Sequence, residues 1–192
     1  MKLRIANLTS NILSPFLVGL VMISLLSFTS ASSTLTALKW VLISSVLSIL
    51  PIFLIVMYLV HNHRLDTFFI KTRAQRTKIY LLATLWGILG CALLIYLKAP
   101  TMLVAAYVVG LVMVVIFMCI NIWWKISLHT ASVSASVTTL VLLYGWTAMA
   151  TAVLIPLVAW ARIELKYHSI AQTVMGALLA AIIVVFVFVR LF

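Results

Sequence analysis

Carboxylates are almost absent from this sequence: among its 192 residues, the only acidic side chains are those of Asp66 and Glu164. Charged residues of every kind make up 8% of the chain, whereas hydrophobic residues make up 66%. Because soluble globular domains are closer to half apolar and a quarter charged, this composition indicates an integral membrane protein. The scarcity of acids also argues against a magnesium site, and against a proton- or cation-coupled carrier, which commonly uses intramembrane carboxylates.

Cysteine is equally scarce, and no metal-binding spacing of cysteines occurs. Cys91 and Cys119 lie inside apolar segments, which indicates plain core residues rather than a disulfide framework. His61 and His63 have a His-x-His spacing that could grip a metal, although solvated loop histidines are the simpler interpretation. We therefore expect no metal and no other cofactor.

Basic residues are plentiful by comparison and give a formal net charge of +11. In a soluble protein this charge would indicate nucleic-acid binding. Here the cations lie in short loops between apolar segments, where they set membrane topology and bind lipid headgroups. We therefore expect a membrane partner and no nucleic acid.

Seven segments are apolar over most of the roughly 20 residues that a membrane span requires. They are Ile12–Phe28, Trp40–Val60, Ile79–Leu97, Met102–Ile120, Ala131–Trp146, Thr147–Trp160 and Ile170–Leu191. The first lacks a cleavage site followed by polar sequence, so we expect a retained helix rather than a signal peptide. The fifth and sixth are short, and a re-entrant segment among the seven would leave six spans. The sequence predicts an all-α, polytopic transmembrane bundle of six or seven spans in a single membrane domain, residues 1–192.

The charged connections fall on one face of the predicted bundle. In the seven-span topology they are His61–Lys78, Asn121–Thr130 and Arg162–Ser169. With the amino terminus, this face holds ten lysines and arginines, against three on the other face. Without the cations that could bind phosphate, the count is still six against three. The positive-inside rule therefore predicts that this face is cytoplasmic.

Glycines within the spans indicate helix packing, and tryptophans beside cations indicate the membrane–water interface. Small residues within spans let helices approach closely, and those placed this way are Gly87, Gly90, Gly110 and Gly176. Tryptophans beside cations suit the membrane–water interface, as is the case for Trp123, Trp124 and Trp160.

Polar and ionisable residues at the ends of the apolar segments form the pattern that points to function. Such groups are costly near the membrane interior and are therefore functional candidates. They are Arg76, Ser127, His129, Arg162 and His168. Two arginines, two histidines and a serine, with almost no carboxylates nearby, favour a pocket for an anion such as phosphate.

The segment from Arg162 to Gly176 resembles a known signature. It is similar to the third motif of the type 2 phosphatidic acid phosphatase superfamily, which reads Ser-Arg-x5-His-x3-Asp. In this chain Arg162 is followed after five residues by His168 and after three more by Gln172. Gly176 comes four residues after Gln172. The soluble relatives of that superfamily include the vanadium haloperoxidases. The resemblance implies the helical core of that family over about residues 64–192.

Two further matches occur in the order that the family requires. Ser127 and His129 match the serine and histidine of its second motif, Pro-Ser-Gly-His, at the start of a membrane helix. Arg76 matches the arginine of its first motif, Lys-x6-Arg-Pro, but Phe69 stands where the lysine should be.

The resemblance implies a metal-independent lipid phosphatase. His168 would be the nucleophile and form a phosphohistidine, and His129 would protonate the leaving alkoxide and then activate water. The forked guanidinium groups of Arg76 and Arg162 would hold the phosphate. Ser127 could donate its hydroxyl, and the backbone N–H of Leu128 lies at a helix start, which favours anions.

Two departures from the family pattern concern charge. Gln172 replaces the motif's aspartate; its carbonyl can orient His168, but it brings no negative charge, which could slow catalysis. Arg73 or Lys71 could replace the missing lysine in phosphate binding.

The sequence leaves several alternatives open. The protein could be a catalytically silent lipid-binding or scaffold relative, a prenyl-diphosphate lyase or cyclase, or a small transporter. The histidines could simply bind backbone carbonyls, and the arginines could anchor helix ends by snorkelling. We expect a multi-pass protein of the cell membrane that hydrolyses an isoprenoid or glycerolipid phosphate at a cytoplasmic site.

Overall fold

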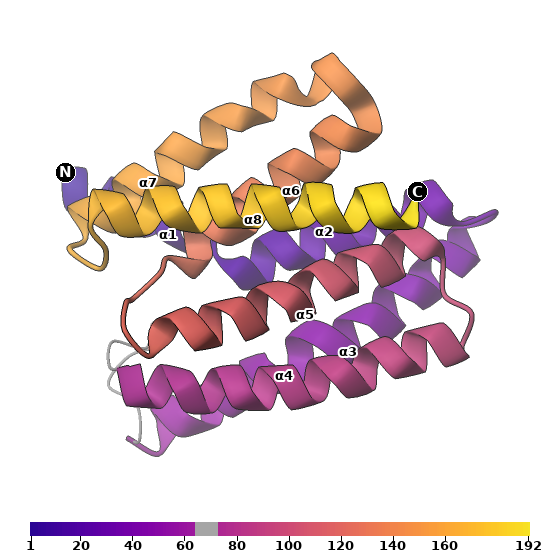
Figure 1. Ribbon diagram of the computed structural model, residues 1–192, viewed down its shortest axis with the longest axis horizontal. Coiled ribbons are helices and arrows are strands. Elements are labelled where there is room, and N and C mark those ends of the chain that lie inside the picture. Colours follow the sequence, from indigo (N-terminus) through magenta and orange to yellow (C-terminus); the bar gives the residue numbers. More distant parts are fainter. Residues whose placement is uncertain (64–72) are drawn as a thin grey trace. The chain divides into compact units, whose positions relative to one another are not determined.

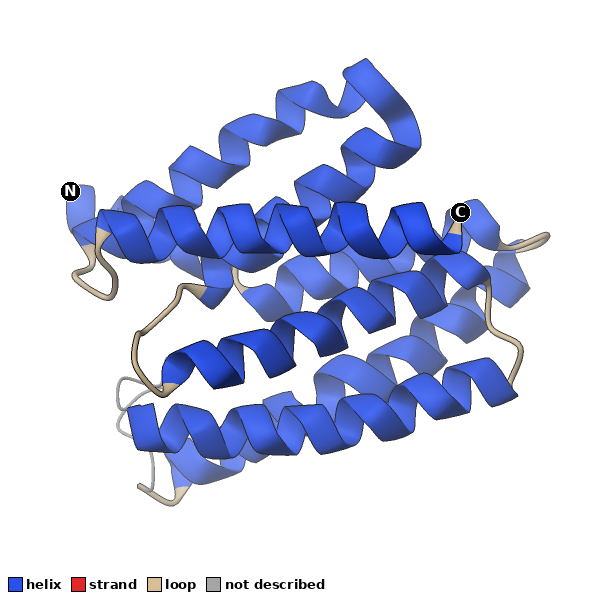
Figure 2. Cartoon of the chain, in the orientation of Figure 1, coloured by secondary structure: helices blue, strands red, loops and turns tan. Residues whose placement is uncertain are grey.

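The computed structural model describes residues 1–63 and 73–192, with side chains described from Met1 to His63 and from Gln75 onward. Within these ranges the chain forms helices joined by loops (Figures 1 and 2), which confirms the all-α class for the described residues. The elements are α1 (Lys2–Ile12), α2 (Pro15–Ser30), α3 (Thr34–His61), α4 (Arg73–Tyr96), α5 (Thr101–Asn121), α6 (Leu128–Tyr144), the 3₁₀ helix η1 (Gly145–Val153), α7 (Leu154–Glu164) and α8 (Ile170–Leu191).

Among the described residues, five helical stretches are long and apolar enough to cross a membrane. They are Thr34–His61, Gln75–Tyr96, Thr101–Asn121, Leu128–Glu164 and Ile170–Leu191. The number rises to six if α1 and α2, which meet at an angle of 41°, count as one broken span. The expected first span, Ile12–Phe28, therefore begins at a bend. The protein is a multi-pass helical membrane protein whose described residues contain five or six candidate spans, where we expected six or seven.

The number of candidate spans falls below seven because residues 128–164, expected as two spans, form one continuous helical stretch. Figure 1 shows that this stretch reverses direction at η1, so that α7 runs back along α6. Gly145, at φ 63°, is the C-cap residue of α6 and lies one residue before the expected end of the fifth segment at Trp146. The hydroxyls of Thr147 and Thr151 each donate to the carbonyl three residues earlier at 2.7 Å, which suits the tight 3₁₀ winding of η1.

The described chain divides into two compact units, residues 1–19 with 125–192 and residues 20–124. The single membrane domain that we expected stays a prediction.

In the unit of residues 20–124, α4 packs against α5 through small residues. A Cβ atom added at Gly90 would lie 2.5 Å from the hydroxyl of Tyr107, and one at Gly87 would lie 3.1 Å from a methyl group of Leu111. These two glycines thus permit the close approach that we predicted. The prediction was wrong for Gly110, where an added Cβ would meet nothing within 4 Å. Cys119 is also exposed rather than part of the core.

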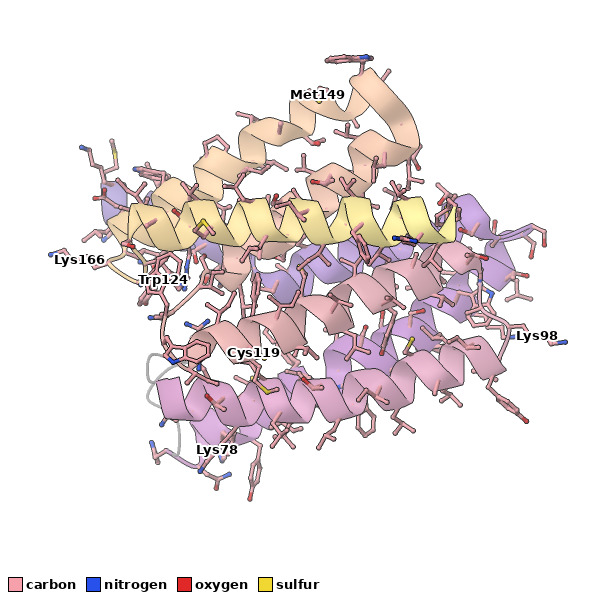
Figure 3. The ribbon with its side chains drawn as sticks, in the orientation of Figure 1. Lys78, Lys98, Cys119, Trp124, Met149 and Lys166 are labelled. Carbon is pink, nitrogen blue, oxygen red and sulfur yellow. The ribbon has the colours of Figure 1, made fainter. Side chains whose placement is uncertain are left out.

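The loop between α4 and α5 is a tight turn. Lys98 adopts a left-handed conformation, φ 56°, and its side chain projects away from the helices (Figure 3). The N–H of Ala99 donates to the carbonyl of Leu94 at 2.9 Å, which satisfies a helix-end carbonyl.

In the unit of residues 1–19 and 125–192, α6 lies along α8 (Figure 1). The hydroxyl of Ser134 on α6 donates to the carbonyl of Ala177 on α8 at 2.8 Å. A Cβ added at Gly176 would lie 2.7 Å from the carbonyl oxygen of Ser127, so this glycine lets α8 touch the first turn of α6. Val133, Val137 and Val158 form the apolar core between α6 and α7.

We predict that Gly176→Ala lowers the free energy of unfolding by about 1–3 kcal/mol, because the added methyl group forces α6 and α8 apart. Gly110→Ala is the matched control, and its stability should be unchanged or higher by up to about 1 kcal/mol, since the site is open and alanine favours helices. Thermal denaturation in detergent measures both. Equal stability of Gly176→Ala and wild type would contradict the close approach.

Candidate active site

The second motif lies at the start of α6. Ser127 is the N-cap residue, and its hydroxyl oxygen accepts a hydrogen bond from the N–H of Thr130 at 3.4 Å. Leu128 opens the helix, so its backbone N–H is one of the donors that an α-helix leaves without an intrahelical acceptor. His129 follows within the first turn and is 5% exposed. A buried serine and a buried histidine therefore accompany a helix end whose dipole favours anions.

Arg162 lies in the last turn of α7 and is 4% exposed, which contradicts the snorkelling alternative for this residue. Its Nη1 donates to the hydroxyl oxygen of Ser10 at 2.8 Å. Its guanidinium also lies over the ring of Tyr167, 4.5 Å from the centroid, in a cation–π contact. Burial of a guanidinium is costly unless the group has partners. The contacts with Ser10 and Tyr167 provide partners and hold the guanidinium in a defined orientation.

The loop after α7 explains why five residues separate Arg162 from His168. Lys166 takes up a left-handed conformation, φ 53°, and the loop then turns back on the helix. The N–H groups of Tyr167 and His168 both donate to the carbonyl of Arg162, at 3.1 and 3.3 Å. This is the 6→1 bond of a Schellman helix end, followed by one further bond. The spacing of five residues thus returns the backbone of His168 to Arg162, while Lys166 points outward (Figure 3).

Gln172 orients His168 from the first turn of α8. Its Oε1 lies 3.1 Å from Nδ1 of His168 and accepts a hydrogen bond from the N–H of Ser169 at 3.2 Å. Because a carboxamide oxygen only accepts, this contact requires the proton on Nδ1 and leaves the lone pair on Nε2 of His168. Gln172 and Ser169 also form a capping box, a signal readable from Ser-x-x-Gln that we did not use.

The two motif segments meet within this unit. The N–H of Ser127 donates to the carbonyl of Gln172 at 3.3 Å, which joins the start of α6 to the start of α8. His129 interacts electrostatically with both Arg162 and His168. The predicted residues of the second and third motifs are therefore gathered at one end of the unit.

Two contributors to this cluster were missed by sequence reasoning. Ser10 of α1 accepts the bond from Arg162, and its backbone hydrogen-bonds to His129. The ammonium group of Lys125 donates to the carbonyl of Tyr167 at 3.1 Å. No sequence signal marks Ser10, because it precedes the region of family resemblance by more than 50 residues.

The first motif lies in the unit of residues 20–124. Arg76 is 6% exposed, so here too the side chain does not snorkel, and its Nη2 donates to the hydroxyl of Tyr80 at 2.6 Å. Arg73 begins α4, but its side chain lies outside the described residues, as do Phe69 and Lys71. The phosphate-binding roles of Arg76 and Arg73 stay predictions.

We predict that His168 is a neutral Nδ1–H tautomer at alkaline pH, observable by ¹⁵N NMR of histidine-labelled protein with the signal assigned through His168→Ala. Gln172→Met removes the acceptor at similar volume and should give a mixture of tautomers. Gln172→Glu keeps an acceptor and should keep the Nδ1–H form. An Nε2–H tautomer in the wild type would contradict the arrangement.

Across residues 1–63 and 73–192, no three His, Cys, Asp or Glu side chains form a group that could hold a metal ion. His61 and His63 are exposed at the end of α3. The site is thus a cluster of two histidines, a buried arginine, a helix start and a glutamine, with geometry suited to binding an anion and presenting an imidazole nitrogen to it. No known protein family, curated protein or solved structure matches this chain.

Proposed function

We propose that this protein is a membrane lipid phosphatase that hydrolyses a phosphate or diphosphate monoester through a phosphohistidine intermediate. The observation that carries the proposal is the meeting of the segments 127–129 and 162–172 around His168, linked by the bond from Ser127 to Gln172. These segments are the two that resemble the second and third motifs of the type 2 phosphatidic acid phosphatases. Geometry and resemblance thus support the same chemistry.

In the first step, Nε2 of His168 attacks the phosphorus atom, and the bond to the leaving oxygen breaks. The Nδ1–H held by Gln172 lets the ring carry the positive charge that develops. His129 must be protonated when the substrate is bound, and it donates this proton to the leaving oxygen and becomes neutral. In the second step, His129 takes a proton from water, the water oxygen attacks phosphorus, and the N–P bond breaks to release inorganic phosphate and regenerate His168.

The transferring phosphoryl group carries negative charge on its equatorial oxygens, so fixed donors lower the barrier. Arg162 offers a forked donor set that is already oriented by Ser10. Ser127 and the backbone N–H of Leu128 add donors at the start of α6. From the sequence pattern alone, Arg76 and Arg73 are further phosphate ligands in this proposal.

The proposed substrates are lipids whose tails lie between helices and whose headgroups reach the polar end of the bundle. Isoprenoid diphosphates, isoprenoid monophosphates and phosphatidic-acid-like lipids fit this description. The excess of cations on the charged face of the topology predicted from the sequence supports a cytoplasmic site in the cell membrane.

A silent lipid-binding relative is the second candidate, and specific contacts favour it. Ser127 caps α6, Gln172 caps α8, and His129 hydrogen-bonds to the backbone of Ser10, so each residue also has a structural role. This candidate predicts phospholipid binding without turnover.

We expect the purified protein in detergent to release phosphate from farnesyl or geranylgeranyl diphosphate, undecaprenyl phosphate or phosphatidic acid. Release should persist in EDTA, be inhibited by vanadate, and fall by about 10³-fold or more in His168→Ala, which removes the nucleophile. The control is unchanged thermal stability of the variant. Lipid binding by the wild type without release would favour the silent relative.

We further expect Gln172→Asp to retain turnover or raise it by up to about tenfold, because a carboxylate orients His168 and stabilises its cation. Steady-state kinetics beside Gln172→Met, which has no acceptor and should be slower than wild type, measures the effect. Complete loss in a folded Gln172→Asp protein would show that the amide N–H₂ group is itself required.

A further inference from the structure

The amino-terminal helix α1 lies outside all three motifs, yet it reaches the candidate site. Its buried residues are Ala6 and Ser10, which are one turn apart on the same face, and α1 packs against α7. Ser10 is 1% exposed. Its hydroxyl oxygen accepts the 2.8 Å bond from Nη1 of Arg162, across 152 positions of sequence.

Packing alone does not explain a serine at this position. Ala6 fills the equivalent place one turn earlier with a methyl group, and alanine favours helix more than serine does. Serine hydroxyls within helices commonly bond to the carbonyl four residues earlier, as Ser24 and Ser48 do in this chain. The oxygen of Ser10 instead serves a guanidinium on another helix.

Two different atoms of Ser10 serve two different site residues. The hydroxyl oxygen fixes the guanidinium of Arg162, whereas the backbone hydrogen-bonds to His129. A charged donor makes a stronger hydrogen bond than a neutral one, so the contact with Arg162 restricts the rotation of a long side chain. An arginine that is already held in one orientation can bind an anion without a further ordering cost for its side chain.

We propose that Ser10 is a positioning residue of the phosphate site, and that α1 is therefore part of the active site. It holds Arg162 through its side chain and His129 through its backbone. This inference rests on the proposed function, since it assigns Arg162 to the phosphoryl group. Because alanine keeps the backbone contact, Ser10→Ala separates the two roles.

The test compares Ser10→Ala with wild type and with the control Asn7→Ala. Asn7 lies on the exposed face of α1 and donates to the carbonyl of Leu3 at 3.0 Å. Ser10→Ala should weaken vanadate inhibition and lower kcat/KM by about tenfold, because the bond to a charged group is lost. The shape of the pH–rate profile should not change, because His129 keeps its backbone contact. Asn7→Ala should change neither quantity.

A double-mutant cycle measures the coupling between Ser10 and Arg162 in vanadate inhibition, and a general loss of helix packing would not produce this coupling. In the Arg162→Lys background, Ser10→Ala should have little further effect on vanadate inhibition, since the guanidinium that it positions is gone. Additive effects, or an equal loss in Asn7→Ala, would overturn the inference, as would vanadate inhibition within twofold of wild type in Ser10→Ala. If the wild type itself neither binds vanadate nor releases phosphate, the proposed function fails, and that outcome is visible before any variant is compared.

Discussion

The closure of the α7–α8 loop onto the carbonyl of Arg162 determines where the proposed catalytic groups lie. Two consecutive N–H groups, those of Tyr167 and His168, bond to this one carbonyl. The left-handed conformation of Lys166 permits the reversal, and the capping box of Ser169 and Gln172 starts the next helix immediately afterwards. Short-range backbone bonding thus brings an arginine, a histidine and the residue that orients the histidine into one place.

Burial of cationic and imidazole groups is the second constraint on this molecule. A chain with two carboxylates offers few internal anions, and yet Arg162 and His129 are buried among helices. Such placement costs free energy in a membrane protein and is typical of functional sites. In the proposed function, the anionic headgroup of the lipid substrate would complement this buried guanidinium.

The sequence predicted the features that local patterns control. Apolar length located α5 and α8 to within a residue or two, and the spacing of Arg162, His168 and Gln172 identified a cluster that the fold does assemble. Prediction failed where tertiary packing decides. Nothing local distinguishes Gly110, which meets no neighbour, from Gly90, which lies against Tyr107. Ser10 could not be found either, because its partner is on a distant helix. At η1 the expected division between the fifth and sixth segments falls on a turn that keeps a helical winding, in which the hydroxyls of Thr147 and Thr151 bond to carbonyls three residues earlier.

The central claim is that His168 carries the phosphoryl group between substrate and water. The most direct measurement is to mix the protein with a ³²P-labelled lipid phosphate, quench the reaction within one turnover in alkali, and map the labelled peptide by mass spectrometry. The account predicts an acid-labile, alkali-stable phosphoryl group on His168 that disappears as phosphate is released. Phosphate release with no label on His168 at any time, or with a label on another residue, would contradict it.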